Sequence, residues 1–431
     1  MFISRFLTFV IFFVTSAVST AGDVSILLEK SQKGVWSVSY SSLVPVKQLS
    51  FKRSPDNSRK NRWMSLSDTF RFDYDGNIEK VSRIDGKPFK RVTFQLKATY
   101  ISLPKEYAPF SPYTDGGVLL HTGRFFACAE ICLPEYNEWS IEVQSAKSDN
   151  IIVRGRIYTE KAKWLDGDEG IKVYVGRAIP QNESSFVSVI DENLPEELKT
   201  QISSQLPLLM NFFSLNMGKL EYRPALFASY SSTDDGTYGH QGGAIPGQMF
   251  MHWYGSKAIE EINSDEVFWF FSHEVAHLFQ REGANINDLK DQWLHEGGAE
   301  FFAGKAMEHF TNDSDIFQQK LEAAHKSCLS ALDEGGGYAE ISRRNPKLHY
   351  SCGMSIFSAI DEGLSKNSGI NIYKLWSLYN KRVASGNPAG ALTFIAVAKP
   401  YLPDGLTSSL YEFSSSSEVD LLRFFSEMSK L

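Results

Sequence analysis

Residues 273–277 read HEVAH, and this pentad lies inside a helical pattern that covers residues 264–282. Two histidines four residues apart lie on one face of a helix, so His273 and His277 can both bind one metal ion. Glu274 lies about 100° further round the helix, where it can contact a water on that ion instead of the ion itself. The pentad therefore indicates a metal-binding helix with a general base, although by composition it occurs by chance in roughly one chain in a hundred of this length.

Residues 293–300 read WLHEGGAE, and 18 residues separate His277 from the glutamate of this second segment, Glu296. In order, spacing and flanking residues the sequence resembles the gluzincin metallopeptidases, in particular the aminopeptidase N family. That family has a zinc-binding helix of this pattern and a ligand glutamate within Trp-Leu-x-Glu-Gly. The resemblance implies that His273, His277 and Glu296 bind one zinc ion, with water in the fourth position, as a catalytic zinc site requires.

Several residues near Glu296 are unusual for the exposed surface of a helix. Gly297 and Gly298 each cost a helix about 1 kcal/mol relative to alanine, and a rule broken in this way often marks a functional site or a close backbone approach. Glu300, one turn beyond Glu296, is a candidate hydrogen-bond acceptor for a ligand histidine; the alternative is a solvated helix glutamate. His295 stands where the family usually has asparagine, and we expect it to be structural.

Residues 349–353, HYSCG, precede an apolar helix and provide a third match. The family has a Tyr-x-x-Gly sequence at a similar distance after its ligand glutamate, and that tyrosine donates a hydrogen bond to the oxyanion of the tetrahedral intermediate. The resemblance gives this role to Tyr350, and one such donor typically contributes roughly a hundred- to a thousandfold in rate. The alternative is a packing tyrosine, and we expect His349 to be a surface residue.

One departure concerns the family's Gly-x-Met-Glu-Asn sequence, whose glutamate holds the free amine of an aminopeptidase substrate. Residues 242–246, GGAIP, and residues 247–251, GQMFM, both occupy that region. Depending on the register, the glutamate is replaced by Ile245 or by Phe250. Whether the substrate is cut from its amino terminus or internally is therefore open.

The same region supplies the candidates for substrate binding. Residues 248–253 read as a strand, which could pair with an extended peptide through main-chain hydrogen bonds. Gly243, Ala244 and His240 are the substrate-binding candidates beside this strand. The two aspartates at 234–235 could replace the missing amine anchor, but they fit loop positions better.

These roles imply hydrolysis of an amide without a covalent intermediate. Zinc lowers the pKa of its water toward about 7, Glu274 takes the proton, and hydroxide attacks the scissile carbonyl. Zinc and Tyr350 stabilise the oxyanion, and Glu274 passes the proton to the leaving amine. The sequence therefore predicts a zinc metallopeptidase with a peptide or protein substrate. The alternative is a catalytically inactive gluzincin that binds peptides or acts as a scaffold: the intact Glu274 argues against it, and the missing amine anchor argues for it.

The composition of the 431-residue chain is that of an acidic globular protein. Its 44 Lys and Arg against 51 Asp and Glu give a formal net charge of −7, so no basic excess is available to bind nucleic acid. Hydrophobic residues make up 42% and charged residues 22%, which excludes disordered, collagen-like and coiled-coil classes for most of the chain. The length allows two or three domains.

Residues 1–21 have the pattern of a secretory signal peptide. Arg5 precedes an uncharged apolar run, residues 6–18, and residues 19–21, Ser-Thr-Ala, offer small side chains where a signal peptidase reads. The competing interpretation is a membrane anchor, but the run is short for a span of about 20 residues. We expect cleavage before Gly22, export to the periplasm or outside the cell, and no stable membrane insertion afterwards.

Export permits disulfide bonds among Cys128, Cys132, Cys328 and Cys352. Three pairings are possible, and we prefer one that joins Cys328 to Cys352. The alternative is four buried thiols. Because no Cys-x-x-Cys pair occurs, the cysteines do not predict a zinc site.

The expected fold class is α+β, with an N-terminal antiparallel β-sandwich over residues 22–168 and a catalytic domain over residues 169–431. Alternating apolar residues in 91–100, 139–143 and 171–175, separated by turn signals, indicate half-buried strands. By resemblance, the second domain is thermolysin-like and mainly helical. Helices are expected at residues 194–217, 264–282, 291–310, 314–333, 349–364, 371–383 and 417–429, and strands at 224–231 and 248–253.

Two of these helices have sequence signals at their ends. Asn263 or Ser264 can cap the start of the metal-binding helix, and Gly283 can end it. Ser417, with Asp420 three residues on, can cap the last helix.

Overall fold

The computed structural model of the chain describes residues 20–103, 106–134, 136–260, 262–286, 288–311, 315–333 and 338–415. Most of the predicted signal peptide and the whole predicted helix 417–429, with its Ser417 cap, lie outside these residues, so both stay predictions. Within the described ranges, none of the helices combines the length and the apolar character that crossing a membrane requires.

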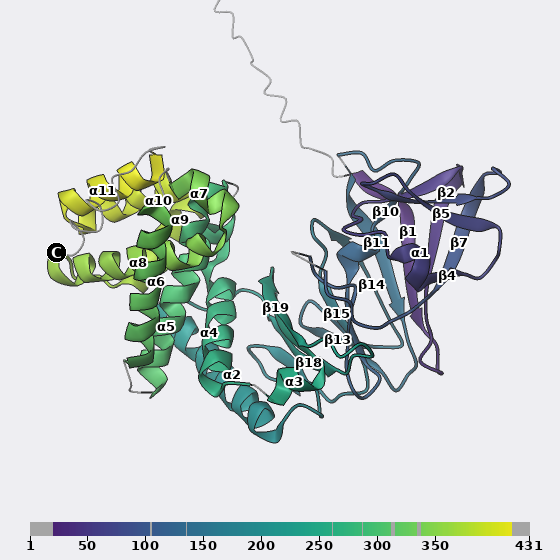
Figure 1. Cartoon of the computed structure of the whole chain (residues 1–431), viewed down its shortest axis with the longest axis horizontal. Helices are drawn as coiled ribbons and strands as arrows, with labels where there is room; N and C mark the ends of the chain where they lie inside the picture. The colour runs from purple at the N-terminus through teal and green to yellow at the C-terminus, as the bar shows by residue number, and fades with distance from the viewer. Residues whose placement is uncertain are drawn as a thin grey trace, which may run out of the picture. The chain divides into compact units, whose positions relative to one another are not determined.

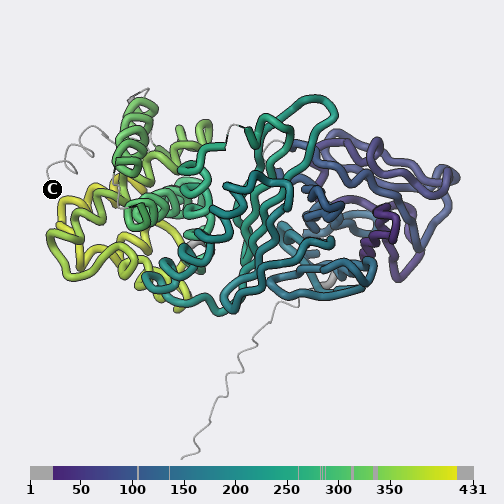
Figure 2. Tube along the Cα trace, turned by 90° about the horizontal axis from the view of Figure 1, so that it is seen from below, coloured from purple at the N-terminus to yellow at the C-terminus, as the bar shows by residue number. Residues whose placement is uncertain are grey.

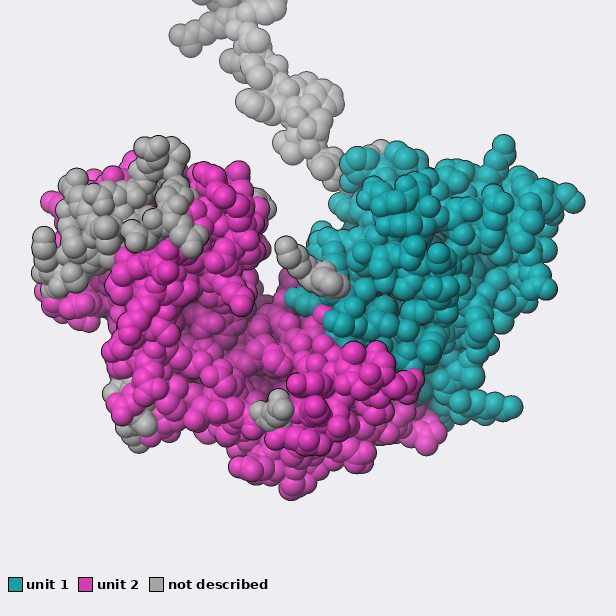
Figure 3. Space-filling model, in the orientation of Figure 1, with its two compact units in different colours: residues 1–109, 121–147, 159–171 teal, residues 110–120, 148–158, 172–431 magenta. Residues whose placement is uncertain are grey.

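The chain forms two compact units, shown in different colours in Figure 3. The first unit comprises residues 1–109, 121–147 and 159–171, and the second comprises residues 110–120, 148–158 and 172–431. The chain enters the second unit for the last time at Lys172, close to the expected border after residue 168. The two earlier segments of the second unit were not predicted, because a short strand carries no signal for the sheet that it will join.

The first unit is a β-sandwich of a six-stranded and a four-stranded sheet, as predicted (Figure 1). The larger sheet has the order β14 (Lys161–Gly167), β11 (Tyr136–Gln144), β1 (Thr20–Lys30), β2 (Trp36–Val46), β7 (Phe89–Leu96) and β4 (Trp63–Ser65). The smaller sheet has the order β10 (Ala127–Ala129), β3 (Gln48–Phe51), β6 (Glu79–Arg83) and β5 (Phe70–Tyr74). The short helices are α1 (Arg59–Arg62) and η1 (Thr122–Arg124). The pairs in both sheets are antiparallel except β1 with β11, which is parallel.

Apolar side chains on alternate strand positions fill the space between these sheets. Phe72 of β5 and Phe94 of β7 have ring centroids 4.9 Å apart. In β11 the alternation buries Trp139, Ile141 and Val143 completely, as their spacing predicts. The hydrophobic period of the sequence therefore determines which face of each strand packs inward.

A five-stranded sheet belongs to the second unit and corrects one strand prediction. Its order is β13 (Arg156–Thr159), β12 (Asn150–Val153), β15 (Lys172–Gly176), β9 (Val118–His121) and β8 (Phe110–Pro112). All residues of β15 are buried, so this strand is covered on both faces rather than half-buried. In the first unit, β7 ends at Leu96, so the expected strand 91–100 is too long.

A second five-stranded sheet carries the edge strand next to the candidate site. Its order is β16 (Gln181–Asn182), β17 (Val187–Ile190), β18 (Ala225–Ser231), β20 (Gln248–Tyr254) and β19 (Gly239–Ile245). The pairs β17–β18 and β18–β20 are parallel, and β19 runs antiparallel to β20 at the edge of the sheet. β18 and β20 confirm the strands predicted at 224–231 and 248–253.

Helices make up the rest of the second unit, and Figure 2 follows the trace into them through green to yellow. The α-helices are α2 (Glu196–Met217), α3 (Ser256–Glu260), α4 (Ser264–Gln280), α5 (Gly298–Thr311), α6 (Asp315–Asp333), α7 (Tyr338–Arg344), α8 (Lys347–Asn367), α9 (Ile372–Ala384), α10 (Ala391–Ala398) and α11 (Asp404–Ser415). Tighter 3₁₀ turns are η2 (Arg281–Ala284), η3 (Leu289–Asp291) and η5 (Lys399–Tyr401), and η4 (Trp293–Gly297) is a π-helical turn. α4 packs against α2 and α5 and against the strands β19 and β20.

The helix predictions hold where the hydrophobic period is clear. α2, α4, α6, α8 and α9 are confirmed. The helix predicted at 291–310 is α-helical only from Gly298, as α5, and is preceded by η4. α3, α7, α10 and α11 were not predicted; α10, with the sequence ALTFIAVA, has almost no polar face. Asn263 is the N-cap of α4, and its side chain accepts hydrogen bonds from two backbone N–H groups of the first turn at 2.9 and 3.2 Å. The predicted stop at Gly283 is wrong, because α4 ends at Gln280 and Arg281 has a φ of 53°.

Two disulfide bonds are present. Cys328 of α6 is bonded to Cys352 of α8, which confirms the preferred pairing, and Cys128 is bonded to Cys132 in the first unit. The four-thiol alternative is therefore wrong. Because Cys352 lies two residues after Tyr350, the bond ties the candidate catalytic end of α8 to α6.

Candidate metal centre and active site

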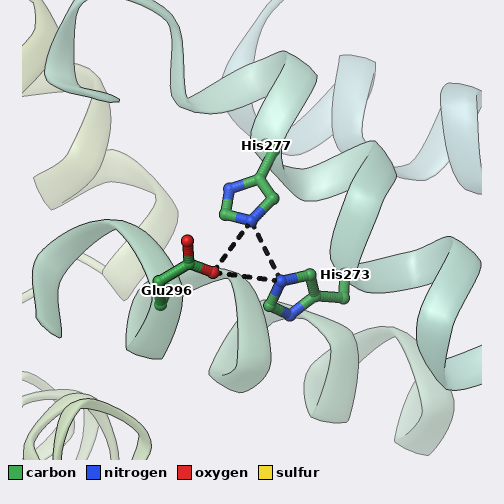
Figure 4. Close-up of side chains that lie close together, drawn as sticks. All are labelled: His273, His277 and Glu296. Carbon is green, nitrogen blue, oxygen red and sulfur yellow. Dashed lines mark hydrogen bonds and ion pairs between the residues drawn. The ribbon is translucent and has the colours of Figure 1, made fainter. Parts of the chain in front are cut away.

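Two histidines from α4 and a glutamate from η4 converge in the second unit, as Figure 4 shows. The Nε2 atoms of His273 and His277 lie 2.9 Å apart. Glu296 Oε2 lies 3.5 Å from His273 Nε2 and 3.3 Å from His277 Nε2. The structure thus brings together the three residues that the sequence predicts as metal ligands.

The donor atoms of this group fit a zinc ion. Imidazole nitrogen and carboxylate oxygen bind Zn²⁺ at about 2.0–2.2 Å, so tetrahedral ligands lie about 3.3 Å from one another. The three distances between the donor atoms, 2.9, 3.3 and 3.5 Å, lie close to this value. Two nitrogens and one oxygen are also the donor set of many catalytic zinc sites with one position left for water.

The charges around the group favour a cation. Burial lowers the pKa of His273, but its hydrogen bond with Glu296 and the charge of Glu300 outweigh burial and raise that pKa to about 9. Burial would raise the pKa of Glu296, yet His277 and His273 hold it well below its usual range. The carboxylates therefore stabilise positive charge among the donors, which is the charge that a divalent cation would supply.

The position of Glu296 depends on a backbone contact between η4 and α8. A Cβ added at Gly297 would lie 2.2 Å from the Cα of Gly353, and one added at Gly353 would lie 2.4 Å from the carbonyl oxygen of Trp293. Only glycine permits this approach on both sides. Gly297 and Gly353 therefore allow Glu296 to lie beside Tyr350. The π-helical form of η4 is itself typical of functional sites.

Gln280, the last residue of α4, orients His277. Its side-chain N–H donates to the carbonyl oxygen of His295 at 2.8 Å, which turns its own oxygen toward Nδ1 of His277 at 2.7 Å. An amide oxygen can only accept, so Nδ1 of His277 donates to it and Nε2 is the nitrogen that faces His273 and Glu296. Gln280 is fully buried and was not predicted, because a glutamine three residues after the pentad belongs to no quoted motif.

Glu300 of α5 faces the other histidine. Its Oε1 lies 3.5 Å from Nδ1 of His273, and Trp269 donates its indole N–H to Oε2. Nδ1 is the ring nitrogen that points away from the other two donors. Glu300 thus lies on the side of His273 where an acceptor is expected, at an ion-pair distance rather than in a hydrogen bond, and it is not a solvated surface residue.

Glu274 lines a cavity of about 550 Å³, which we call the first cavity. His273 and Tyr350 share this lining, and apolar rings such as Phe270 cover much of the rest. The side chain is 7% exposed, and burial raises its pKa against the lowering effect of His273 and His277. Glu274 is outside the group that could hold the metal, so it is free to act on a molecule in the cavity.

Tyr350 stands at the same cavity with its ring stacked on His273. The ring centroids lie 5.7 Å apart at an interplanar angle of 19°, and 38% of the residue is exposed. Burial raises the pKa of Tyr350, and the charge of Glu296 raises it further. The hydroxyl therefore stays protonated and able to donate.

The two remaining histidines of the motifs, His295 and His349, lie outside the group that could hold the metal. His349 is buried and its Nδ1 shares a 2.7 Å hydrogen bond with the hydroxyl of Tyr338, so the expectation of a surface histidine is wrong. His295 lies with its ring centroid 4.0 Å from that of His277. Burial, reinforced by the charge of His277, lowers the pKa of His295 to about 3, so the ring is neutral and serves as a wall of the site.

The substrate-binding candidates all lie on the edge strand β19. His240 lines the first cavity, and Ala244 lines a second cavity, of about 500 Å³, that also contacts His277. Gly243 lies between them on the strand. Asp235 accepts hydrogen bonds from the backbone N–H and the hydroxyl of Thr237, so it stabilises a turn, as the loop interpretation expects.

Solved structures share this fold over most of the chain. An aminopeptidase N family protein from Idiomarina loihiensis is similar with a TM-score of 0.62 and 10% identity, over 94% of this chain and 78% of its own. Yeast LTA4 hydrolase in complex with bestatin has a TM-score of 0.53 and 11% identity, over 92% and 68%. A mutant M1 zinc metallopeptidase from Deinococcus radiodurans, bound to the substrate Tyr-Ser-Ala, has a TM-score of 0.51 and 12% identity, over 93% and 95%.

The chain has an aminopeptidase N-like gluzincin fold. No protein-family model matches the sequence, and no curated protein matches it. The predicted resemblance of the sequence is therefore confirmed at the level of the fold, which carries the three ligand candidates of the gluzincin site on α4 and η4.

Replacing Gly353 with alanine is expected to push η4 and α8 apart and to displace Glu296 and Tyr350 together. We predict that Gly353→Ala lowers zinc affinity by about tenfold or more, measured by competition with a chelator. Gly405→Ala in α11 is the matched control, because its added Cβ meets open space. Equal zinc affinity in Gly353→Ala and wild type would contradict the proposed role of this contact.

Removing the Gln280 amide is expected to release the ring of His277. Gln280→Leu should weaken zinc binding about 10- to 100-fold, whereas Gln280→Glu, which keeps an acceptor for Nδ1, should lose less. Gln318→Leu, at an exposed position of α6, controls for the change of residue type. The account is wrong if Gln280→Leu folds and binds zinc as tightly as this control.

Proposed function

We propose that the chain is an exported zinc-dependent metallopeptidase that hydrolyses peptide bonds. The observation that carries the proposal is the convergence of His273, His277 and Glu296 within 3.5 Å of one another beside a cavity that also contains Glu274. His273, His277 and Glu296 would hold one zinc ion. Zinc at such a site supplies a water of lowered pKa, near about 7, and polarises a carbonyl oxygen.

Glu274 acts as the proton carrier. Its buried carboxylate sits one residue after a ligand on α4 and faces the first cavity, where it accepts the proton of the attacking water and donates it to the leaving amine. Burial raises the pKa of Glu274, which makes the carboxylate a better base than an exposed glutamate.

Tyr350 and β19 act on the substrate itself. The protonated hydroxyl of Tyr350 donates to the carbonyl oxygen as negative charge develops on it. β19 is an edge strand, and its backbone can pair with an extended peptide that passes His240, Gly243 and Ala244. A peptide or protein substrate suits this arrangement, whereas the net charge of −7 disfavours nucleic acid as a partner.

A second candidate function is a peptide-binding gluzincin without catalytic activity. The observation in its favour is that the amine-holding glutamate of the resembled family is missing. Its place is taken by Ile245 of β19 in one register and by Phe250 of β20 in the other. The buried Glu274 beside the metal group argues for the enzyme, because a binding module has no use for a base.

Replacing Glu274 with glutamine tests the proposal. Glu274→Gln should keep its zinc and lose about 10²–10⁴-fold of the rate on a fluorogenic peptide library, because only proton transfer is removed. Glu322→Gln, at an exposed position of α6, should match wild type. Equal cleavage by wild type and Glu274→Gln would refute the peptidase proposal, and zinc binding without any cleavage would favour the binding module.

A further inference from the structure

The second cavity borders the metal group on the side of His277 and His295. It has a volume of about 500 Å³, a size that holds one or two amino-acid side chains. Ala244 and Ile245 of β19 line it, so a peptide paired with that strand passes both cavities. Whatever group of the substrate enters here lies next to the bond that the metal site would cleave.

Three arginines line this second cavity: Arg154 after β12, Arg223 before β18, and Arg281 after α4. The described lining contains no carboxylate. The first cavity is the opposite, because its lining includes Glu266, Glu274 and Glu300 and no arginine among the described residues. The charged side chains that line the two cavities therefore differ in sign.

Neutral oxygens hold two of these guanidinium groups in place. Arg223 donates to the carbonyl oxygens of Phe186 and Gly155 at 3.0 and 3.3 Å, and Arg281 donates to those of Gly218, at 2.5 Å, and Lys219. A carbonyl group orients a guanidinium without neutralising it.

Neither of these two guanidinium groups has a carboxylate partner within the described part of the chain. Arg223 and Arg281 form no ion pair there, and the Nε–H group of each is buried without an acceptor. The second cavity therefore keeps a positive potential in the absence of substrate.

We propose that the second cavity is a subsite for a carboxylate of the peptide substrate, next to the scissile bond. The inference rests on the proposed function and adds a preference for one class of peptide substrate. A fixed guanidinium binds a carboxylate through paired, charge-assisted hydrogen bonds, and several of them repel an ammonium group. An unblocked amino terminus is thus disfavoured beside Ile245, one of the two positions, with Phe250, at which the amine-holding glutamate of the resembled family is replaced.

Binding to the inactive Glu274→Gln protein, loaded with zinc, tests the subsite without requiring cleavage. The probes are labelled alanine-based peptides, acetylated and amidated, with one Glu or one Gln scanned through each position. At one position, Glu should bind about 10- to 100-fold more tightly than Gln, and the preference should shrink as ionic strength rises. A third set of peptides contains Gln and has a free C-terminal carboxylate. It shows whether the subsite binds the C-terminal carboxylate of a peptide or the side-chain carboxylate of Glu.

Two variants test whether the arginines cause the preference for Glu over Gln. Arg281→Met and Arg154→Met, each made in the Glu274→Gln protein, should bring the Glu to Gln ratio toward one, whereas Arg343→Met, at an exposed position of α7, should leave it unchanged. Arg281→Lys, which keeps the charge, should retain part of the ratio if the loss of Arg281 disturbs folding.

The outcomes separate the subsite from the proposed function. A ratio of one at every position, or failure of both peptides to bind, would overturn the subsite. A Glu preference that survives in both arginine variants would also overturn it. A preference that depends on the arginines, together with no cleavage by the wild type, would remove only the peptidase proposal.

Discussion

The backbone contact between Gly297 and Gly353 is the constraint on which the site depends. It lets η4 lie directly against α8, so that Glu296 of η4 and Tyr350 of α8 both lie beside the two histidines of α4. A side chain at either glycine would separate them by more than the tolerance of a zinc coordination sphere. The disulfide from Cys352 to Cys328 holds the same end of α8 to α6.

Side chains of α4 and α5 lie against the two histidines of the metal group. Gln280 determines which nitrogen of His277 carries the proton, Glu300 faces the outer nitrogen of His273, and Trp269 holds Glu300. These contacts come from the end of α4, from its second turn and from α5. The metal group is thus prepared by folding, which lowers the cost of ordering its ligands when a cation binds.

The sequence predicts the ligands because zinc chemistry constrains residue type and local spacing, and both are visible in HEVAH and in the glutamate that follows at a fixed interval. It also predicts the sandwich strands and the amphipathic helices, whose periods are local. It does not predict Gln280, the arginines of the second cavity or the burial of His349, because these depend on which distant segments pack together. The apolar helix α10 was not predicted, and η4 was predicted as ordinary helix rather than as a π-helical turn, because tertiary packing overrides the local period there.

The central claim is that three side chains of this chain hold one zinc ion. Metal analysis of the purified wild type and of His277→Ala, after equilibration with a limiting chelator, measures it most directly. The account predicts one zinc per wild-type chain and almost none in the folded variant, since two remaining donors bind zinc poorly. A wild type without zinc, or a variant with as much zinc as the wild type, would contradict it.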